Sequence, residues 1–224
     1  MKILFTGSNG LLGQKIAVAT EKYPQHTFLA TSRGENRTKA MGTAAYASMD
    51  ITNAADVSSV VGAFAPDVII HGAAMTHVDE CELHPKKATL MNVEGTRNIT
   101  HAANEVGAHV VHISTDFIFD GKDGPYKEDA LAQPLSHYGW TKLEAEEIIQ
   151  ELPSGEFVTL LDSMITAPAN LENLGLMFPV FGEQSLGLNR YYLTIDARDD
   201  IEEAPAFAEL NNELVRSNGS VGLE

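Results

Sequence analysis

Short apolar runs alternate with longer stretches of helical periodicity along residues 1–150 of the chain. The short runs are rich in β-branched residues, and we expect strands at Lys2–Thr6, Thr27–Thr31, Ala45–Met49, Asp67–His71, His109–Ser114 and Glu156–Leu161. We expect helices at the longer stretches Leu11–Thr20, Ala54–Phe64, Pro85–Val106 and Tyr138–Glu151. Strands that alternate with helices form βαβ units, whose right-handed crossovers cover both faces of a parallel sheet. The pattern therefore predicts an α/β fold built on a doubly wound parallel sheet.

The regular alternation ends near residue 162. Three prolines interrupt the part that follows, at Pro168, Pro179 and Pro205. Weaker patterns there predict a strand at Arg190–Ile195 and helices at Asn170–Met177 and Asp200–Val215. We therefore expect residues 1–160 to form the main domain and residues 161–224 to form a small, atypical C-terminal region. Residues 116–137 are rich in glycine, proline and aspartate, which predicts a long loop of the kind that usually serves function.

Composition limits the classes of protein to which the chain can belong. Its 224 residues and apolar fraction of 44% suffice for one sizeable core with a small appendage. The apolar runs are only a few residues long, so we expect no membrane span, and the strand-like N-terminus does not resemble a secretory signal. Cys81 is the only cysteine, so no internal disulfide can form, which is consistent with a reducing compartment and a cytoplasmic location.

Acidic residues are concentrated in the C-terminal part of the chain. The formal net charge is −16; residues 1–142 contain 12 Lys and Arg against 15 Asp and Glu, and residues 143–224 contain 3 against 16. Nucleic acids need basic surfaces, so we expect no nucleic-acid partner. The simplest interpretation of the acidic part is a solvated surface that favours solubility.

A glycine-rich segment follows the first expected strand and leads into the first expected helix. It reads Gly7-Ser8-Asn9-Gly10-Leu11-Leu12-Gly13, a G-x-x-G-x-x-G pattern related to the dinucleotide-binding fingerprint. Glycine allows positive φ and lets backbone N–H groups approach a pyrophosphate, and a helix N-terminus adds free donors and partial positive charge. The pattern favours nucleotide binding over the alternative, a tight turn without a ligand.

The end of the second expected strand indicates which cofactor this segment would bind. In NAD-binding proteins an acidic residue about 20 residues beyond the glycines binds the ribose 2′-hydroxyl. This chain has Ser32 and Arg33 there, which suit a 2′-phosphate, so we favour NADP(H) over NAD(H), with a solvated Arg33 as the alternative. Asp50 and Ile51, after the third strand, are candidates to flank the adenine, and Asp50 could equally cap the helix that begins at Ala54.

Tyr138 and Lys142 stand one helical turn apart in the last helix expected before residue 160. Side chains at that spacing emerge on one face, and a nearby ammonium lowers the pKa of a phenol from its free value of about 10. Such a tyrosine can transfer a proton near neutral pH. The alternative is an exposed aromatic ring beside a solvated lysine. We expect His71, His109 and His112 to be satisfied core or edge residues.

Five segments in this order resemble the extended branch of the short-chain dehydrogenase/reductase superfamily, and in particular its dTDP-4-dehydrorhamnose reductases and related sugar-nucleotide reductases. They are Ile3–Gly13, Pro66–Thr76, Asn92–Asn98, Ser114–Gly121 and Tyr138–Glu144, within residues 1–150. The resemblance implies a Rossmann fold and an NAD(P)-dependent reduction of a keto group on a nucleotide-linked deoxy sugar. It also implies that the cofactor is bound by the backbone around Gly7, Gly10, Leu11 and Leu12 and lined by Ala73, Ala74 and Met75.

The same resemblance implies the catalytic roles. Thr115 would donate a hydrogen bond to the substrate carbonyl, although a β-branched residue at a strand end needs no such role. Tyr138 would donate the proton, and Lys142 would bind the nicotinamide ribose and tune Tyr138. Asn92 would support this network from its helix.

The C-terminal part departs from that family. Its members are longer and follow the sixth strand with an Arg-Thr pair and a Tyr-Gly pair, whereas Asp162 occupies the expected arginine position here. A second interpretation is therefore a catalytically silent subunit that binds NADP or a sugar nucleotide, as a relative of this fold regulates methionine adenosyltransferase. A truncated cofactor domain is a third. The sequence leaves open which sugar nucleotide is bound and whether the chain forms a homo-oligomer.

Overall fold

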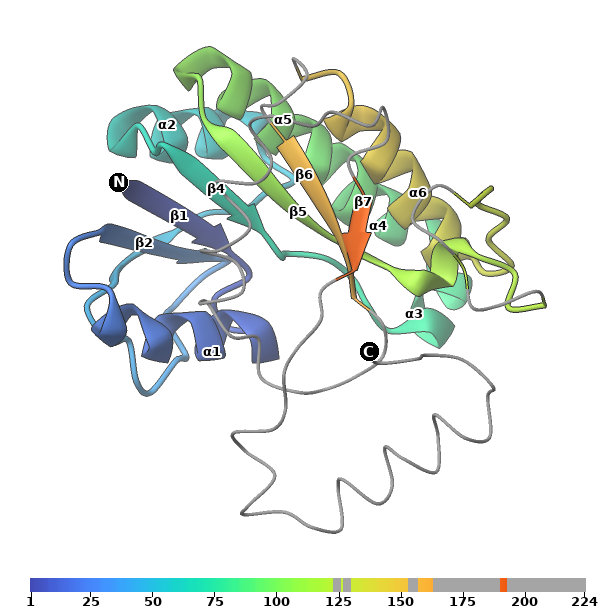
Figure 1. Ribbon diagram of the computed structural model, residues 1–224, viewed down its shortest axis with the longest axis horizontal. Coiled ribbons are helices and arrows are strands. Elements are labelled where there is room, and N and C mark those ends of the chain that lie inside the picture. The colour runs from blue at the N-terminus through green and yellow to red at the C-terminus, as the bar shows by residue number, and fades with distance from the viewer. Residues whose placement is uncertain (123–125, 127–129, 153–156, 163–189, 193–224) are drawn as a thin grey trace, which may run out of the picture.

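The computed structural model describes residues 1–122, 126, 130–152, 157–162 and 190–192. The strands in these ranges form one seven-stranded parallel sheet in the order β3-β2-β1-β4-β5-β6-β7 (Figure 1). Their bounds are β1 Lys2–Thr6, β2 Thr27–Ser32, β3 Ala45–Ser48, β4 Val68–His71, β5 His109–Thr115, β6 Phe157–Asp162 and β7 Arg190–Tyr192. The predicted doubly wound parallel sheet is confirmed.

Helices cover both faces of the sheet (Figure 1). The helical segments are α1 Leu11–Ala19, α2 Ala54–Phe64, α3 Val78–Leu83, α4 Pro85–Thr89, a π-helical turn at Leu90–Glu94, α5 Gly95–Val106 and α6 His137–Ile149. Short 3₁₀ turns lie at Thr20–Lys22 and Asp116–Ile118. One face of the sheet packs on α1, and the opposite face packs on α2, α5 and α6.

Two hydrophobic cores lie on the two sides of the sheet because successive residues of a strand point to opposite faces. In β1, Ile3 and Phe5 belong to the core under α1, together with Ile16 of that helix. Leu4, between them, belongs to the core under α2, α5 and α6, together with Ile99. Both faces of the central strands are thus buried, which explains their almost continuous apolar sequences.

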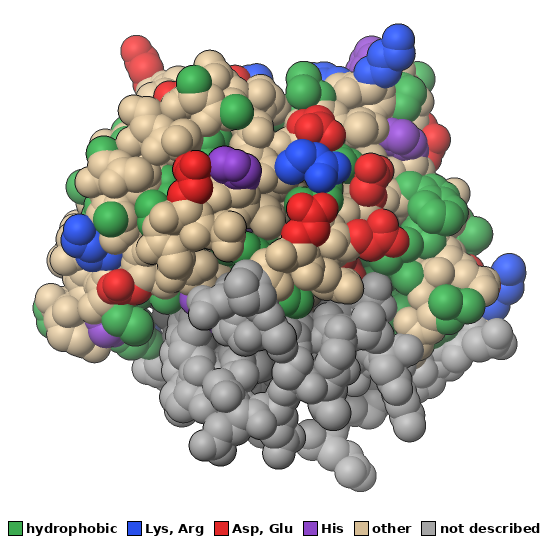
Figure 2. All heavy atoms as spheres, turned by 90° about the horizontal axis from the view of Figure 1, so that it is seen from above, with side chains coloured by type: hydrophobic (Ala, Val, Ile, Leu, Met, Phe, Trp, Pro, Cys, Tyr) green, Lys and Arg blue, Asp and Glu red, His purple; other side chains and the backbone are tan. Residues whose placement is uncertain are grey.

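Charged side chains of both signs occupy the outer surface of the helices. Arg97 of α5 forms ion pairs with Glu94 (3.5 Å) and Glu151 (3.6 Å). Figure 2, which views the molecule from the side of α2 and α5, shows acidic side chains around a basic one in the middle of this face. Exposed ion pairs contribute little to stability, so the fold depends mainly on the two buried cores. Among the described residues, no helix is long and apolar enough to cross a membrane.

The structure differs from the expectations at α3, at the π-helical turn and at the N-cap of α2. α3 was not expected, and the helix expected over Pro85–Val106 contains the π-helical turn. The N-cap of α2 is Asn53, whose side chain accepts from the N–H groups of Ala55 and Asp56, so Asp50 does not cap this helix. The strand expected at Arg190–Ile195 is β7, described as far as Tyr192.

Other predictions stay untested. The helices expected at Asn170–Met177 and Asp200–Val215 lie outside the described residues. The division at residue 160 stays a prediction, although β7 pairs with β6 and thus belongs to the same sheet as the first strands.

Candidate active site

A groove of about 720 Å³ runs along the carboxyl ends of the parallel strands. It is lined by Thr6 at the end of β1, Ser32 at the end of β2, Gly72 after β4 and Thr115 at the end of β5. The strand order reverses at this point, since the chain moves outward from β1 to β3 in one direction and from β4 to β7 in the other. Crevices at such a switch point are where open α/β sheets bind ligands.

The glycine segment forms a tight turn between β1 and α1 at the centre of this groove. Gly7 has φ +74°, and the Gly10 N–H donates to the Gly7 carbonyl at 2.8 Å. A Cβ on Gly13 would lie 2.4 Å from both the Gly7 oxygen and the Ser8 Cα, so helix and turn approach more closely than any other residue allows. Gly7 and Gly13 are therefore required by the backbone geometry itself.

The start of α1 presents backbone donors at the groove. The first intrahelical bond runs from the Gln14 N–H to the Gly10 carbonyl at 3.0 Å. The N–H groups of Leu11, Leu12 and Gly13 consequently have no acceptor within the helix, and all three residues line the groove. Such a set of donors, at the positive end of a helix dipole, suits a phosphate.

The loop after β2 is tied to the glycine turn. The Asn9 side chain donates to the Glu35 carbonyl at 3.0 Å and accepts from the Arg37 N–H at 2.8 Å. The Thr38 hydroxyl donates to the Ser8 carbonyl at 2.9 Å. Ser8 itself is fully buried and lies outside the groove lining, so the structure does not place this predicted cofactor residue at the groove.

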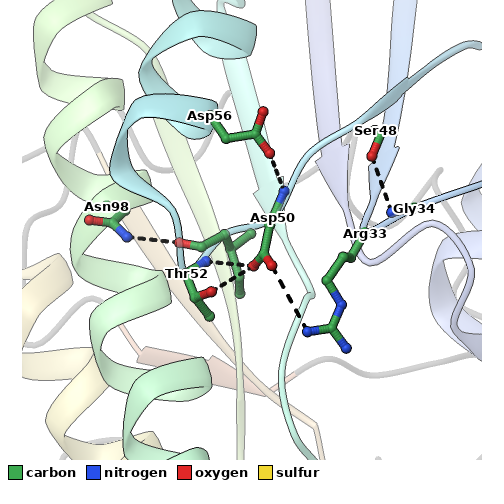
Figure 3. A network of polar contacts seen from close by, with 8 residues as sticks. Arg33, Gly34, Ser48, Asp50, Thr52, Asp56 and Asn98 are labelled. Carbon is green, nitrogen blue, oxygen red and sulfur yellow. Dashed lines mark hydrogen bonds and ion pairs between the residues drawn. The ribbon is translucent and has the colours of Figure 1, made fainter.

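Arg33 belongs to a polar network at the end of the groove beside β2 and β3, which we call the outer end (Figure 3). Its guanidinium lies 3.9 Å from the Asp50 carboxylate, which also accepts from the hydroxyl (2.7 Å) and N–H (3.0 Å) of Thr52. Burial raises the pKa of Asp50, but the Thr52 hydrogen bonds and the Arg33 charge outweigh it and leave this pKa below its ordinary value. Asp50 is thus an ionised partner within ion-pair distance of the exposed Arg33 side chain.

Cations outnumber acids among the described residues that line the groove. These residues include the basic Lys15, Arg33, Arg37 and Lys142 and one carboxylate, that of Asp50. The excess favours an anionic ligand. Sequence reasoning missed Lys15 and Arg37, because neither follows a strand end directly; Arg37 is brought to the groove by its bond to Asn9.

The three predicted catalytic residues line the inner end of the same groove. Thr115 ends β5, while Tyr138 and Lys142 project from the first two turns of α6, whose N-cap Ser136 accepts from the Gly139 N–H at 3.1 Å. α6 packs directly on the segment after Thr115, since a Cβ on Gly139 would lie 2.3 Å from the Phe117 carbonyl oxygen. This contact brings the strand end and the helix face together.

The three residues are held in buried positions. Tyr138 is 8% exposed and Lys142 is 3% exposed, so neither is the solvated side chain of the alternative interpretation. The Phe117 ring packs edge-on against the Tyr138 ring, with the ring centroids 5.8 Å apart. The Thr115 hydroxyl accepts from the Phe117 N–H at 3.3 Å and donates to the Asp116 carboxylate at 3.4 Å. Burial raises the pKa of Asp116, although hydrogen bonds lower it in part.

Asn92 joins the π-helical turn to two parts of the site. Its side chain accepts from the Met75 N–H (2.7 Å) and donates to the Met75 carbonyl (3.0 Å) and the Thr141 hydroxyl (2.9 Å). Asn92 is 1% exposed, so these bonds form in a dry environment where polar groups need partners. The side chain fixes both the segment after β4 and the turn of α6 that carries Lys142. Met75 itself lies outside the groove lining, while Ala73 and Ala74 line it.

We expect Asn92→Ala to lower the free energy of unfolding by about 1–3 kcal/mol, because it leaves the buried Thr141 hydroxyl and the partly buried Met75 backbone groups without this partner. Urea unfolding followed by far-ultraviolet circular dichroism measures the change. Asn104→Ala is the control: this asparagine is exposed on the outer face of α5, and its replacement should stay within about 0.5 kcal/mol of the parent. Equal midpoints for both variants would show that Asn92 holds nothing in place.

Two buried histidines lie behind Lys142. His71 fits the expectation of a satisfied core residue, with ring nitrogens 2.9 Å from the Thr6 hydroxyl and 3.1 Å from the Thr96 hydroxyl. His112 does not: its Nε2 lies 3.2 Å from the Lys142 Nζ, and its Nδ1 is buried without a hydrogen-bond partner among the described residues. His109 lies half-buried at the start of β5.

Sequence reasoning also missed Thr76 and Val78, which line the groove from the start of the unexpected α3.

Comparisons with known proteins agree with this geometry. A family model described as the RmlD substrate binding domain matches residues 1–161. The beta subunit of methionine adenosyltransferase 2 from Bos taurus is 33% identical over 150 residues, which are 67% of this chain and 43% of that protein. The dTDP-4-dehydrorhamnose reductase of Aggregatibacter actinomycetemcomitans is 36% identical over 152 residues, which are 67% of this chain and 47% of that protein.

A solved structure is similar over a longer range. The dTDP-4-dehydrorhamnose reductase of Bacillus anthracis, in complex with NADP, has a TM-score of 0.67 and 26% identity, covering 91% of this chain and 81% of that chain. The chain nevertheless spans less than half the length of the two curated relatives above, at 43% and 47%.

Proposed function

Since the chain belongs to the family of the RmlD substrate binding domain, we propose that it binds a nicotinamide dinucleotide in the groove and reduces a keto group on a nucleotide-linked deoxy sugar. One observation carries the proposal: Thr115, Tyr138 and Lys142 line the same groove as the glycine turn. A relative named dTDP-4-dehydrorhamnose reductase supports the choice of substrate class.

The groove offers a fitting group for each part of a dinucleotide. The N–H groups at the start of α1, beside the glycine turn, would bind the pyrophosphate. Arg33 would bind the 2′-phosphate of NADP(H), and Asp50 and Ile51 would flank the adenine. Ala73 and Ala74 would line the path toward the inner end of the groove.

At the inner end, the side chains supply a proton and stabilise charge. A bound reduced nicotinamide would supply the hydride. The Thr115 and Tyr138 hydroxyls would donate hydrogen bonds to the carbonyl oxygen of the substrate, and Tyr138 would give it a proton as negative charge develops there. The Lys142 ammonium, one helical turn from Tyr138, would favour the phenolate that remains. Solvent is partly excluded, which strengthens these interactions.

A second candidate function is a regulatory subunit that binds the same ligands without turnover. It is favoured by the similarity to the beta subunit of methionine adenosyltransferase 2 and by Asp162, which replaces the arginine expected after the sixth strand. In the sheet Asp162 pairs with Thr115, so the substitution lies beside the proposed catalytic residues. Under this function the groove would bind the dinucleotide, and a partner protein would respond to it.

Binding and turnover can be separated in one experiment. NADPH fluorescence is followed on mixing with the protein, and its oxidation is then followed after addition of dTDP-4-keto-6-deoxy sugars. The proposed reductase enhances the fluorescence and then consumes NADPH. Enhancement without consumption would favour the regulatory subunit, and no enhancement would contradict dinucleotide binding itself.

We expect Arg33→Asp to weaken NADPH binding much more than NADH binding. A charge-assisted hydrogen bond contributes about 1.5–3 kcal/mol, so Kd for NADPH should rise at least about tenfold, while Kd for NADH should change less than about threefold. Fluorescence titration with each cofactor measures both. Lys22→Asp makes the same change of charge outside the groove and should leave both values unchanged. Equal weakening of NADPH and NADH by Arg33→Asp would show that Arg33 does not distinguish them.

A further inference from the structure

The Lys142 ammonium is bound by strand β5. Its Nζ donates to the Ile113 carbonyl at 2.7 Å and lies 3.2 Å from Nε2 of His112. Lys142 is 3% exposed and His112 is 1% exposed, so the two groups meet in a dry environment. A buried ammonium is costly unless acceptors surround it, and these two atoms are acceptors that the sheet supplies.

The direction of this hydrogen bond fixes the tautomer of His112. An ammonium can only donate, so Nε2 must offer its lone pair and the ring proton must reside on Nδ1. Nδ1 is buried and has no hydrogen-bond partner in the part of the chain that the structure describes. Among the described residues, this tautomer gives His112 no hydrogen bond at Nδ1. The hydrogen bond that Nε2 accepts from Lys142 is therefore the contact that explains the tautomer.

His71, on the neighbouring strand, shows the opposite arrangement. The Thr96 hydroxyl donates to the Asn92 carbonyl at 2.6 Å, so it accepts from His71 Nε2–H. The Thr6 hydroxyl accepts from the Ala73 N–H at 3.0 Å and donates to His71 Nδ1. Both nitrogens of His71 are satisfied by threonines, as in a structural core residue. The ring centroids of His71 and His112 lie 5.4 Å apart, but the two rings carry their protons on different nitrogens.

The surroundings keep both rings neutral. Burial lowers the pKa of His112 well below its ordinary value, and the Lys142 charge from α6 and His71 from β4 lower it further. Burial, with a smaller contribution from Lys142, lowers the pKa of His71 to about 3. On the same side of β5, the buried Glu146 of α6 accepts from the Ser114 hydroxyl. A neutral imidazole next to a lysine is a hydrogen-bond acceptor and does not repel it.

We propose that His112 is a positioning residue for Lys142: its Nε2 accepts a hydrogen bond from the ammonium and, with the Ile113 carbonyl, fixes that ammonium at the inner end of the groove. The catalytic consequence rests on the proposed function, whereas the hydrogen bond exists whether or not the chain turns over a substrate. His112 itself does not line the groove, so it would act through Lys142.

Nitrogen-15 NMR of the ring nitrogens tests the bond in the protein without substrate or cofactor. We expect a protonated Nδ1 in His112 and a protonated Nε2 in His71, which serves as the internal reference. Lys142→Met should shift the Nε2 resonance of His112 and leave that of His71 almost unchanged. A protonated Nε2 in His112, or a His112 ring that does not respond to Lys142→Met, would overturn the proposal.

Turnover tests the consequence. Because a displacement of about 1 Å can cost on the order of 100-fold in rate, we expect His112→Leu to lower kcat about 10- to 100-fold, with Kd for NADPH within about threefold of the parent. His112→Gln, whose amide oxygen can accept from the ammonium, should recover most of the rate. His109→Leu, on the same strand but outside the groove, is the control.

Equal rates for His112→Leu and the parent, or equal losses in the His112→Leu and His112→Gln variants, would assign His112 to packing and overturn the proposal. Absence of turnover in the parent chain would contradict the proposed function, and the NMR result would then decide alone.

Discussion

Tyr138→Phe is expected to lower kcat by about 10²–10⁴-fold, the usual contribution of a positioned general acid. Tyr138 is 8% exposed and its ring packs against Phe117, and phenylalanine preserves that packing while it removes the hydroxyl that would donate the proton. Kd for NADPH should therefore change less than about threefold, because the glycine turn and Arg33 would provide most of the binding. Steady-state kinetics and fluorescence titration on one preparation measure both quantities.

Tyr23→Phe is the matched control for this prediction. The change is chemically the same, but Tyr23 follows the 3₁₀ turn after α1 and lies outside the groove lining. Its kcat should equal that of the parent. A Tyr138→Phe variant that reduces the substrate at the parental rate would remove Tyr138 from the mechanism.

Gly13→Ala is expected to have a large effect on both stability and cofactor binding. The added Cβ would lie 2.4 Å from the Gly7 oxygen and the Ser8 Cα, which are backbone atoms, so the turn and α1 must move apart. Overpacking of this kind costs about 1–3 kcal/mol. The same movement displaces the N–H groups at the start of α1, so we expect Kd for NADPH to rise at least about tenfold. Urea unfolding and fluorescence titration measure the two effects.

Gly62→Ala provides the comparison. Gly62 lies within α2 on its solvent-exposed side, and a Cβ there would meet nothing within 4 Å. Alanine is favoured over glycine inside a helix, so this variant should be more stable by about 0.5–1 kcal/mol and should bind NADPH normally. If Gly13→Ala behaved like Gly62→Ala, the close approach of turn and helix would have no role in either property.

The fold was predictable because its strands carry a strong local signal. β4 is buried on both faces and is apolar from Val68 to Ile70, and the bounds of β1 and α2 agree with the expected ranges. α3 was missed because its six residues, Val78–Leu83, include three acids and are too short for apolar periodicity. The π-helical turn that carries Asn92 was missed because one altered turn does not change the apolar pattern of a long helix.

The candidate site was predictable where it depends on spacing and unpredictable where it depends on long-range contacts. The glycine turn and the pair Tyr138 and Lys142 follow from local spacing. Arg37 reaches the groove through a bond to Asn9, 28 positions away in the chain, which no local pattern records. Likewise, the acceptors of Lys142 come from β5, 29 and 30 positions earlier, so the sequence associated this lysine with Tyr138 alone.

The central claim is that the groove binds a dinucleotide whose reactive ring faces Thr115 and Tyr138. A crystal structure of the protein grown with NADPH tests it most directly. We predict the pyrophosphate at the start of α1, the 2′-phosphate at Arg33, and the nicotinamide at the inner end of the groove beside the Tyr138 hydroxyl. NADPH bound elsewhere, or a nicotinamide beyond the reach of the Tyr138 and Lys142 side chains, would contradict the claim.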